Sequence, residues 1–239
     1  MSIRRLFPIK QNLTTKVQEA IFQKIFTSIK SRRNIINHFH RIYYESPRRT
    51  RRNTFWLGVK AQKCPLDLWI YQEIIYETRP DIIIETGTAA GGSALFLASI
   101  CDLLGKGEII SIDIEDQENR PGHPRIKYLL GSSTSKEIVK KIETLIRGQD
   151  RVMAILDSDH HKDHVLRELE IYSRFVTRES YLIVEDTNIN GNPVRSKFGP
   201  GPMEAVKEFL KMNDGFIIDR SREKFYLTFN PDGFLKKLK

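Results

Sequence analysis

Acidic residues end two apolar runs near the middle of the chain, and glycines follow the first of them. The run DIII is followed by Glu85 and by a turn that contains Gly87, and the run EIISI ends at Asp113, 28 positions after Glu85. Glycines let the backbone approach a ligand closely, and an acid at the end of a second strand can accept both ribose hydroxyls of a nucleoside. An acid ahead of the glycine disfavours pyrophosphate and suits a cationic ligand. The pattern predicts a nucleoside-cofactor site, with S-adenosylmethionine as such a ligand; a plain strand-turn-helix connection is the alternative.

Two later apolar runs also end in acids. VMAIL is followed by Asp157 and Asp159, and YLIV is followed by Glu185 and Asp186. Carboxylates that converge at neighbouring strand ends repel one another and lose solvation unless a cation compensates them. Their hard oxygen atoms suit Mg²⁺ or another divalent ion that keeps part of its water. We expect these acids to form a metal site, with Asp157 and Asp159 as alternatives for one ligand. The competing interpretation is that the acids cap helices and fill loops.

Three of the six histidines follow Asp159 within five residues. A histidine has an ordinary pKa near 6.5, which suits the removal of a proton from a hydroxyl that a metal polarises. We expect His160 to be this base, with His161 as a second candidate and Lys162 as the competing one. A structural role or simple metal ligation is the alternative for the histidines.

Strands that alternate with helices must position these groups. Such alternation predicts an α/β fold with a doubly wound, mainly parallel, seven-stranded sheet. In this fold ligands bind at the carboxyl ends of the strands, which is where the acids stand. In chain order the expected elements are helix 65–78, strand 81–84, a helix to 104, strands 108–114 and 126–131, helix 136–146, strand 152–157, helix 164–175, strand 181–186, helix 203–212 and strands 216–220 and 225–229.

The positive charge of the chain belongs to its N-terminal segment. The 239 residues carry a formal charge of +9, and residues 1–60 hold 14 Lys and Arg against 2 acids, whereas the rest holds 25 against 28. From Thr15 to about Tyr44 apolar residues recur at helical spacing, which predicts a basic amphipathic helix. The following run SPRRTRRN holds four arginines that would repel one another in a compact element, so we expect an exposed linker. These features divide the chain into a basic helical extension with its linker, 1–54, and a domain, 55–239.

Composition excludes several other classes of protein. With 40% hydrophobic and 29% charged residues the chain can bury a sizeable core. It has no apolar run near the roughly 20 residues that cross a bilayer and no secretory signal, so a cytoplasmic protein is expected. Cys64 and Cys101 are too few for a disulfide framework and are expected to be reduced thiols. The N-terminal charge comes without a recognisable nucleic-acid-binding motif, so no nucleic acid is expected as a partner.

From about residue 55 to its end, the chain carries a series of stretches that resemble one family. They are WLGVKAQKCPLDLWIYQEII, IIIETGTAAGGSALFLASI, ISIDI, LDSDHHKDHVLRELEIY, YLIVEDTNING, GPGPMEAV and FYLTFNPDGFLKK. In this order they cover roughly three quarters of the chain and resemble the cephalosporin hydroxylase and rhamnosyl O-methyltransferase family. The pair LDSDH and VEDTN is the specific part of the resemblance.

The resemblance implies a class I methyltransferase fold that uses S-adenosylmethionine and Mg²⁺, in which a metal holds the acceptor hydroxyl while a nearby His or Lys removes its proton. By position it implies metal ligation by Glu185, Asp186 and one of Asp157 and Asp159. The cofactor contacts that it implies are Val59, Glu85, Gly87, Ser93, Asp113, Ser132 and Asp157.

We therefore expect an S-adenosylmethionine- and Mg²⁺-dependent O-methyltransferase that acts on a hydroxyl of a sugar or glycosylated metabolite, including a glycolipid. The alternative is a metal-dependent hydroxylase of a small-molecule or antibiotic-like substrate, because some family members carry the hydroxylase name; no 2-His-1-carboxylate iron pattern is visible in the sequence. The basic N-terminal helix is expected to lie on an anionic membrane surface or to pack against a second subunit, and a solvated helix over the domain's own core is the competing interpretation.

Overall fold

The computed structural model describes residues 29–48 and 50–239 and divides the chain into two compact units, Met1–Phe39 and His40–Lys239. Helix α2, Ile29–Glu45, lies within the predicted N-terminal helix and begins in the first unit; the first half of that prediction, with Thr15, falls outside the described residues. Residues 40–54 cluster with the sheet-bearing unit, although the sequence pattern assigns them to the extension.

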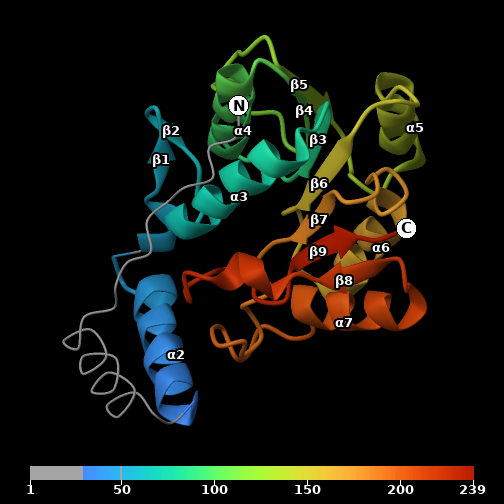
Figure 1. The fold of residues 1–239 in the computed structure, drawn as a ribbon. Coiled ribbons are helices and arrows are strands. Elements are labelled where there is room, and N and C mark those ends of the chain that lie inside the picture. Colours follow the sequence, from blue (N-terminus) through green and yellow to red (C-terminus); the bar gives the residue numbers. More distant parts are fainter. Residues whose placement is uncertain (1–28, 49) are drawn as a thin grey trace, which may run out of the picture. The chain divides into compact units, whose positions relative to one another are not determined.

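A seven-stranded sheet forms the centre of the second unit (Figure 1). Its strand order is β5-β4-β3-β6-β7-β9-β8; strands β3 to β7 run parallel, and β9 is antiparallel to both of its neighbours. The order reverses between β3 and β6, so a ligand site is expected at the carboxyl ends of these strands. The strands are β3 Ile82–Thr86, β4 Glu108–Asp113, β5 Ile126–Leu130, β6 Val152–Leu156, β7 Tyr181–Val184, β8 Phe216–Ile218 and β9 Phe234–Lys237. The predicted doubly wound, mainly parallel α/β sheet is confirmed.

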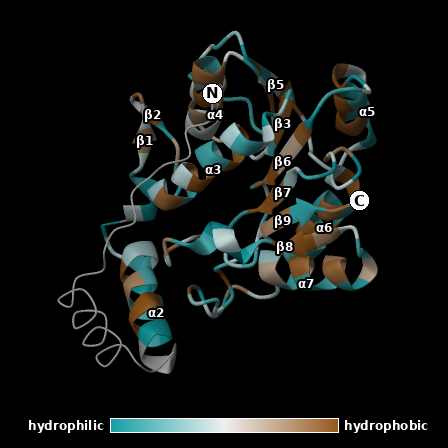
Figure 2. Ribbon diagram, in the orientation of Figure 1, coloured by the Kyte–Doolittle hydropathy of each residue, from teal (hydrophilic) through white to brown (hydrophobic). Residues whose placement is uncertain are grey.

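Helices cover both faces of the sheet, because successive strand residues point to opposite sides. Ile83 packs with α3, Pro65–Thr78, and α4, Gly92–Leu104, whereas Ile82 and Ile84 pack with the helices of the other face. Those helices are α5 Lys136–Leu145, α6 Lys162–Tyr172 and α7 Pro202–Met212. Figure 2 shows the hydrophobic strands between helices whose outer faces are hydrophilic. Each buried aliphatic side chain contributes about 1.5–3 kcal/mol, so the two cores fix where the strands end.

A short hairpin lies ahead of α3 and leads the chain to the strand ends. It consists of β1, Phe55–Trp56, and β2, Val59–Lys60. The indole of Trp56 donates to Ser99 Oγ at 3.1 Å and packs edge-on against Phe96 of α4 at 4.9 Å. The hairpin is thereby anchored on α4. A 3-10 turn, η1 Thr50–Arg52, precedes it, and another, η2 Arg220–Glu223, follows β8.

The predicted final strand, 225–229, is wrong. This segment is irregular, Tyr226 has a left-handed backbone with φ 66°, and Leu227 and Phe229 pack with Tyr44 in a third apolar cluster. The antiparallel strand β9 begins only after Gly233, where a Cβ would lie 2.2 Å from the carbonyl oxygen of Val184. Leu227 and Phe229 pack in this cluster instead of a sheet, whereas Phe225 and Tyr226 are exposed, and apolar period and composition alone do not reveal this difference.

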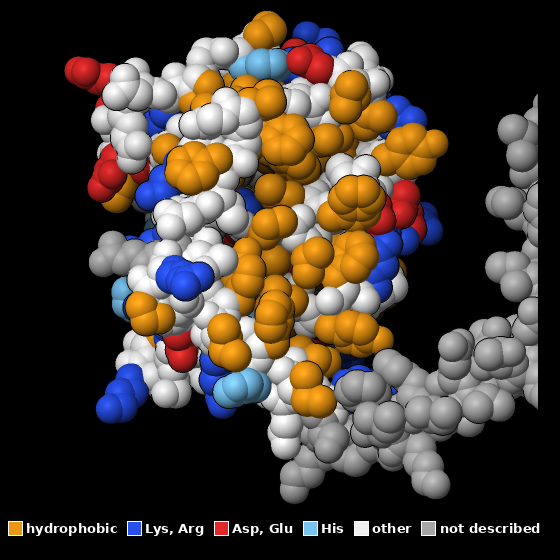
Figure 3. All heavy atoms as spheres, turned by 90° about the vertical axis from the view of Figure 1, so that its left-hand side faces the viewer, with side chains coloured by type: hydrophobic (Ala, Val, Ile, Leu, Met, Phe, Trp, Pro, Cys, Tyr) orange, Lys and Arg blue, Asp and Glu red, His pale blue; other side chains and the backbone are white. Residues whose placement is uncertain are grey.

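Apolar side chains also reach the surface of the second unit. Figure 3 shows them gathered on the side that carries the hairpin and α3. The large exposed ones on these elements are Phe55, Leu57, Trp69 and Tyr76, and none of them belongs to a core cluster. Across the part of the chain that the structure describes, helices long and apolar enough to cross a membrane are absent.

Candidate active site

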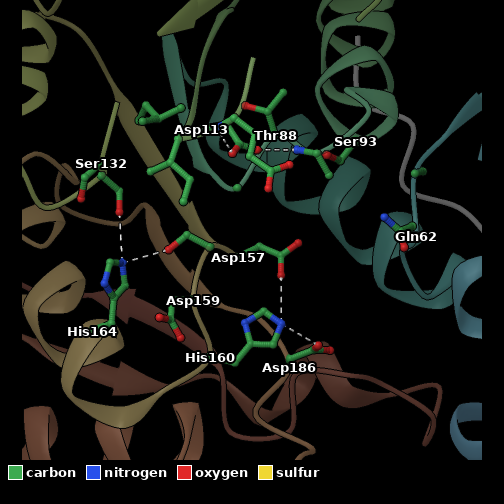
Figure 4. Close-up of a pocket in the computed structure, with 18 of the residues that line it drawn as sticks. Gln62, Thr88, Ser93, Asp113, Ser132, Asp157, Asp159, His160, His164 and Asp186 are labelled. Carbon is green, nitrogen blue, oxygen red and sulfur yellow. Dashed lines mark hydrogen bonds and ion pairs between the residues drawn. The ribbon is translucent and has the colours of Figure 1, made fainter. Parts of the chain in front are cut away.

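A pocket of about 480 Å³ opens at the carboxyl ends of the parallel strands (Figure 4). This volume is typical of a small-molecule site. Its walls come from the loops that follow β3 to β7 and from residues 51–52 and 61–62. The predicted site residues that line it are Gly87, Ser93, Asp113 and Ser132, here called the nucleoside half, and Asp157, Asp159, His160 and Asp186, here called the carboxylate half. The two sites predicted separately thus share one cavity.

Gly87 lies where the two halves meet. Its φ is +84°, and a Cβ there would stand 1.9 Å from the carbonyl oxygen of Asp157. Its N–H donates to the carbonyl oxygen of Ile112 at 2.8 Å, which ties the turn to β4. Only glycine fits this combination of left-handed backbone and close approach. The turn therefore presents bare backbone to the pocket, as a bound cofactor requires.

Asp113 is held in place at the wall of the nucleoside half. Its Oδ2 accepts the N–H of Ala89 at 2.8 Å and its Oδ1 accepts the N–H of Glu115 at 3.0 Å. The guanidinium of Arg120 lies 3.3 Å from Oδ2 and donates to the carbonyl oxygen of Ala89 at 2.9 Å. The carboxylate is thus oriented before any ligand arrives and can still accept the hydroxyls of a ribose.

Glu85 and Val59 do not line the pocket, contrary to the contacts that the resemblance implies. Glu85 is fully buried; one carboxylate oxygen accepts the hydroxyl of Ser111 at 2.6 Å, and the other has no hydrogen-bond partner among the described residues. Burial raises the pKa of Glu85, while the charge of Lys63 opposes the rise. Its place inside β3 keeps its side chain within the core, and Val59 belongs to the hairpin instead.

Lys63 supplies the cation of the carboxylate half. Its ammonium pairs with Asp157 and lies 2.7 Å from Glu185 Oε1, and its side chain is 4% exposed. The hydroxyl of Tyr71 donates to the same oxygen of Glu185 at 2.9 Å. Burial works to lower the pKa of Lys63, but the surrounding carboxylates outweigh it and raise that pKa above its usual value. A buried lysine therefore gives the acids the compensation for which the sequence suggested a metal.

Asp186 and His160 form a second charged pair at the same wall. His160 Nε2 lies 2.9 Å from Asp186 Oδ2 and 3.9 Å from Asp157 Oδ1 (Figure 4). Tyr44 donates its hydroxyl to Asp186 at 3.3 Å. Burial works to lower the pKa of His160, but the hydrogen bond to Asp186 and the nearby carboxylate charges raise it to about 9. The predicted base thus faces the pocket between two predicted metal ligands.

The geometry separates the two alternatives for the third ligand. Asp157 joins Lys63 and His160, whereas Asp159 turns toward the loop and accepts the N–H of His161 at 2.8 Å. Within residues 29–48 and 50–239, three or more His, Cys, Asp or Glu side chains nowhere gather closely enough to hold a metal as they stand. Three of the four predicted ligands nevertheless line the pocket, Asp157, Asp159 and Asp186, and such hard oxygen donors suit Mg²⁺. Glu185, predicted as a ligand, stands behind them with Lys63.

The competing bases lie outside the pocket lining. The side chain of His161 is 72% exposed and its ring lies 5.3 Å from that of Phe198. Lys162 pairs with Glu208 of α7 at 2.5 Å. His161 is the N-cap residue of α6 and Lys162 its first residue. His164 does line the pocket, where its Nε2 lies 3.2 Å from the hydroxyls of Ser133 and Ser158.

Sequence reasoning missed several residues of this wall. They stand far ahead of the acids in the sequence: Lys63 is 94 residues before Asp157, and Tyr44, on which Arg51 stacks, is 142 residues before Asp186. Nothing in their spacing links them to those acids. The one available signal was the demand of the carboxylates for a cation, which a lysine meets as well as a metal does. In the run SPRRTRRN, expected to be an exposed linker, Thr50–Arg52 form η1, and Arg51 and Arg52 line the pocket.

Comparisons with known proteins agree with this architecture. The model of the family described as Rhamnosyl O-methyltransferase/CmcI matches residues 48–238. A rhamnosyl O-methyltransferase of Mycobacterium leprae is 37% identical over 208 residues, which cover 84% of this chain and 90% of that protein. One from Mycobacterium tuberculosis (strain H37Rv) is 36% identical, with 84% of each chain covered.

Two solved structures share the fold. A structure of cmcI with Mg and SAM aligns with a TM-score of 0.61 and 19% identity, over 79% of this chain and 78% of that one. MycE, a methyltransferase of mycinamycin biosynthesis in complex with Mg, SAH and mycinamycin VI, aligns with a TM-score of 0.51 and 16% identity, over 72% and 48%. The predicted class I methyltransferase fold is thereby confirmed.

Proposed function

Because the chain belongs to the Rhamnosyl O-methyltransferase/CmcI family, we propose that it transfers a methyl group from S-adenosylmethionine to a hydroxyl of a sugar or glycosylated molecule, with Mg²⁺ as second cofactor. The observation that carries the proposal is the shared pocket: the Gly87 turn and Asp113 open into the same cavity as Asp157, His160 and Asp186. An enzyme that joins a cofactor to an acceptor needs this juxtaposition, since transfer requires the two reacting atoms to be held together.

The nucleoside half fits S-adenosylmethionine. The turn at Gly87 leaves a cradle that a Cβ would fill, and Asp113 is oriented by two backbone N–H groups. Ser93, at the first turn of α4, and Ser132, after β5, add hydroxyls to the same wall. In this proposal Asp113 binds the ribose hydroxyls, and the Gly87 backbone lies against the rest of the cofactor.

The carboxylate half fits a divalent cation through Asp157 and Asp186, whose carboxylates both line the pocket. When bound, S-adenosylmethionine supplies the methyl group and Mg²⁺ a positive charge for the acceptor oxygen. Lys63 holds Asp157 from behind, and Tyr44 holds Asp186, so both carboxylates are fixed in position. His160 Nε2, which faces both, is the atom we assign to receive the proton of the acceptor hydroxyl. It can do so when the ring is neutral, a form that a cation bound by Asp157 and Asp186 would favour, because its charge would offset the carboxylates that raise the pKa of His160.

We extend the proposal to the N-terminal segment, as a contact with an anionic membrane surface or with a second subunit. Ile35, Phe39 and Ile42 of α2 are each more than half exposed, at 54%, 52% and 56%, and their spacing places them on one helix face. Arg32, Arg33 and Arg41 lie on the same helix. Basic amphipathic helices of this kind bind anionic lipid surfaces, which suits a cytoplasmic enzyme with a glycolipid acceptor.

Liposome sedimentation and light scattering test this contact. The full chain should sediment with anionic vesicles or have the mass of a dimer, and serine at positions 35, 39 and 42 should abolish whichever is seen. A monomer that stays in the supernatant with anionic vesicles contradicts both forms of the proposal.

Intact-mass analysis tests the proposed reaction. The protein is incubated with S-adenosylmethionine, Mg²⁺ and a set of rhamnosides and glycolipids, and each acceptor is weighed afterwards. We expect one acceptor to gain the mass of a methyl group, with S-adenosylhomocysteine formed in equal amount. A gain of oxygen would instead identify a hydroxylase. Binding of neither S-adenosylmethionine nor S-adenosylhomocysteine to the purified protein would overturn the proposal without an acceptor being known.

A further inference from the structure

Two arginines of the pocket lining have no chemical task in the mechanism above. Arg51 and Arg52 both line the pocket. The guanidinium of Arg51 stacks on the ring of Tyr44 with its carbon 4.3 Å from the ring centre, and the hydroxyl of that tyrosine donates to Asp186. Arg51 is thereby fixed beside the carboxylate next to which the acceptor would lie.

A third arginine is held in the same way close by. The guanidinium of Arg195 stacks on Phe198 at 4.6 Å, and its backbone N–H donates to Glu45, the residue after Tyr44. This hydrogen bond places Arg195 beside the end of α2 that carries Tyr44, although Arg195 is not among the residues that line the pocket.

None of these three guanidinium groups has a carboxylate partner within residues 29–48 and 50–239, whereas other arginines do. Arg120, Arg125 and Arg222, for example, each form an ion pair. The carboxylate half already holds two buried cations, since Lys63 pairs with Asp157 and Glu185, and His160 with Asp186. Arg51 and Arg52 thus line the pocket without an ion pair to any described residue.

Stacked guanidinium groups are suited to bind anions. Stacking on an aromatic face fixes the plane of the group and leaves the N–H donors at its edge free, and those donors match the oxygens of a carboxylate or phosphate. A stacked arginine also loses little further freedom when an anion binds, so such a site is prepared in advance.

We propose that Arg51 and Arg52, with Arg195 at the rim, form a subsite for an anionic group of the acceptor. The acceptor is then the hydroxyl of a sugar that carries a carboxylate or a phosphate, such as a uronic acid or a phosphorylated saccharide. This inference rests on the proposed function and narrows its substrate class. The rival occupant is the carboxylate of the cofactor's own methionine. It would lie in the same pocket, which Ala61 and Gln62 also line.

Calorimetry with small probes tests the subsite. The full-length protein, with and without saturating S-adenosylhomocysteine, is titrated with D-glucuronate, glucose 6-phosphate and glucose. At least one anion should bind about tenfold or more tightly than glucose, as expected for charge-assisted hydrogen bonds, and the order of the two anions identifies the anionic group. The double variant Arg51→Gln, Arg52→Gln should bind the anions no better than glucose. Arg48→Gln, which removes an exposed arginine of the same run outside the pocket lining, should change nothing.

Two results would overturn the subsite. One is a wild-type protein that binds the anions no better than glucose. The other is a double variant that loses affinity for S-adenosylhomocysteine, which would assign the arginines to the cofactor. A failure of the proposed function is distinct from both: the wild-type protein would then not bind S-adenosylhomocysteine, while the titrations without it would still report on the anions.

Discussion

The nucleoside half and the carboxylate half of the pocket are held by different forces. In the nucleoside half, Asp113 is oriented by two backbone N–H groups, and Gly87 contributes bare backbone. In the carboxylate half, buried charges hold one another: Lys63 is paired with Asp157 and Glu185, and His160 with Asp186. Backbone groups suffice to bind a cofactor that is the same in every reaction cycle. A site that must bring charged groups together for a reaction depends on side chains.

This difference predicts which substitutions destabilise the protein. Backbone donors persist when a neighbouring side chain is changed, so the nucleoside half should tolerate most substitutions other than at Gly87, at Asp113 and at Arg120, whose guanidinium pairs with Asp113. Removing one member of a buried charge pair leaves the other without compensation, which destabilises a fold strongly. Substitutions in the carboxylate half should therefore act on both stability and rate.

The largest effect is expected from His160→Ala. Loss of the general base should lower the rate of methyl transfer by about 10²- to 10⁴-fold. The affinity for S-adenosylhomocysteine should stay the same, because the nucleoside half is untouched. His161→Ala is the matched control, since that side chain is exposed and lies outside the pocket lining. Equal losses of rate in the two variants would show that His160 has no special role.

Lys63→Met should be the most destabilising change in the carboxylate half. It leaves Asp157 and Glu185 buried without their ammonium, and we expect the free energy of unfolding to fall by about 3–5 kcal/mol in urea titrations. The control is Lys60→Met, which removes an exposed lysine of the same segment. Adding Glu185→Gln to Lys63→Met should restore part of the stability. If Lys63→Met and Lys60→Met unfold at the same urea concentration, the ammonium does not stabilise the cluster.

Gly87→Ala should disturb both halves of the pocket, because Gly87 lies against the carbonyl oxygen of Asp157. The left-handed backbone alone costs about 1–2 kcal/mol, and the new Cβ collides with the carbonyl oxygen of Asp157. We expect lower stability together with weaker binding of S-adenosylhomocysteine and slower transfer. Gly122→Ala is the control, since open space surrounds a Cβ there. A Gly87→Ala protein that matches the control in all three measurements would contradict the geometry of the turn.

A smaller effect is expected from the pH dependence of His40. Burial lowers the pKa of His40 to about 4, and Asn188 donates to its Nε2 at 2.9 Å. Between that value and the ordinary 6.5 the unfolded chain binds a proton that the folded chain does not, so stability is lost as the pH falls. The wild-type protein should lose about 1 kcal/mol more than His40→Gln between pH 7 and pH 5.5. Parallel losses in the two proteins would show that His40 is not the group responsible.

How far the sequence predicted the site follows the same division. Glu85, Gly87 and Asp113 follow apolar runs, which mark strand ends, so local pattern alone predicted that the Gly87 turn and Asp113 lie at these ends, where both line the pocket. The pattern did not show that Glu85 points into the core, because it does not tell which side of a fully buried strand a residue faces.

Of the carboxylate half, the sequence predicted the acids and His160, but not the side chains that contact the acids from elsewhere in the chain. Asp157, His160 and Asp186 follow strands, but Lys63 and Tyr44 reach them from elements 94 and 142 residues away in the sequence. Such pairs are made by tertiary packing and leave no periodicity behind. The same reason applies to the run SPRRTRRN: its charge predicts an exposed linker, and the sequence does not show that Arg51 and Arg52 line the pocket.

The central claim is that the nucleoside half binds the cofactor and the carboxylate half serves the acceptor. It is tested most directly by calorimetric titration of S-adenosylhomocysteine into three proteins: the wild type, Asp113→Ala and Asp186→Asn. The account predicts that Asp113→Ala weakens binding by about 10- to 100-fold, because hydrogen bonds to a charged group are lost. Asp186→Asn should bind as the wild type does, since its carboxylate serves the acceptor side. Equal affinity of Asp113→Ala and wild type, or an equal loss in Asp186→Asn, would contradict it.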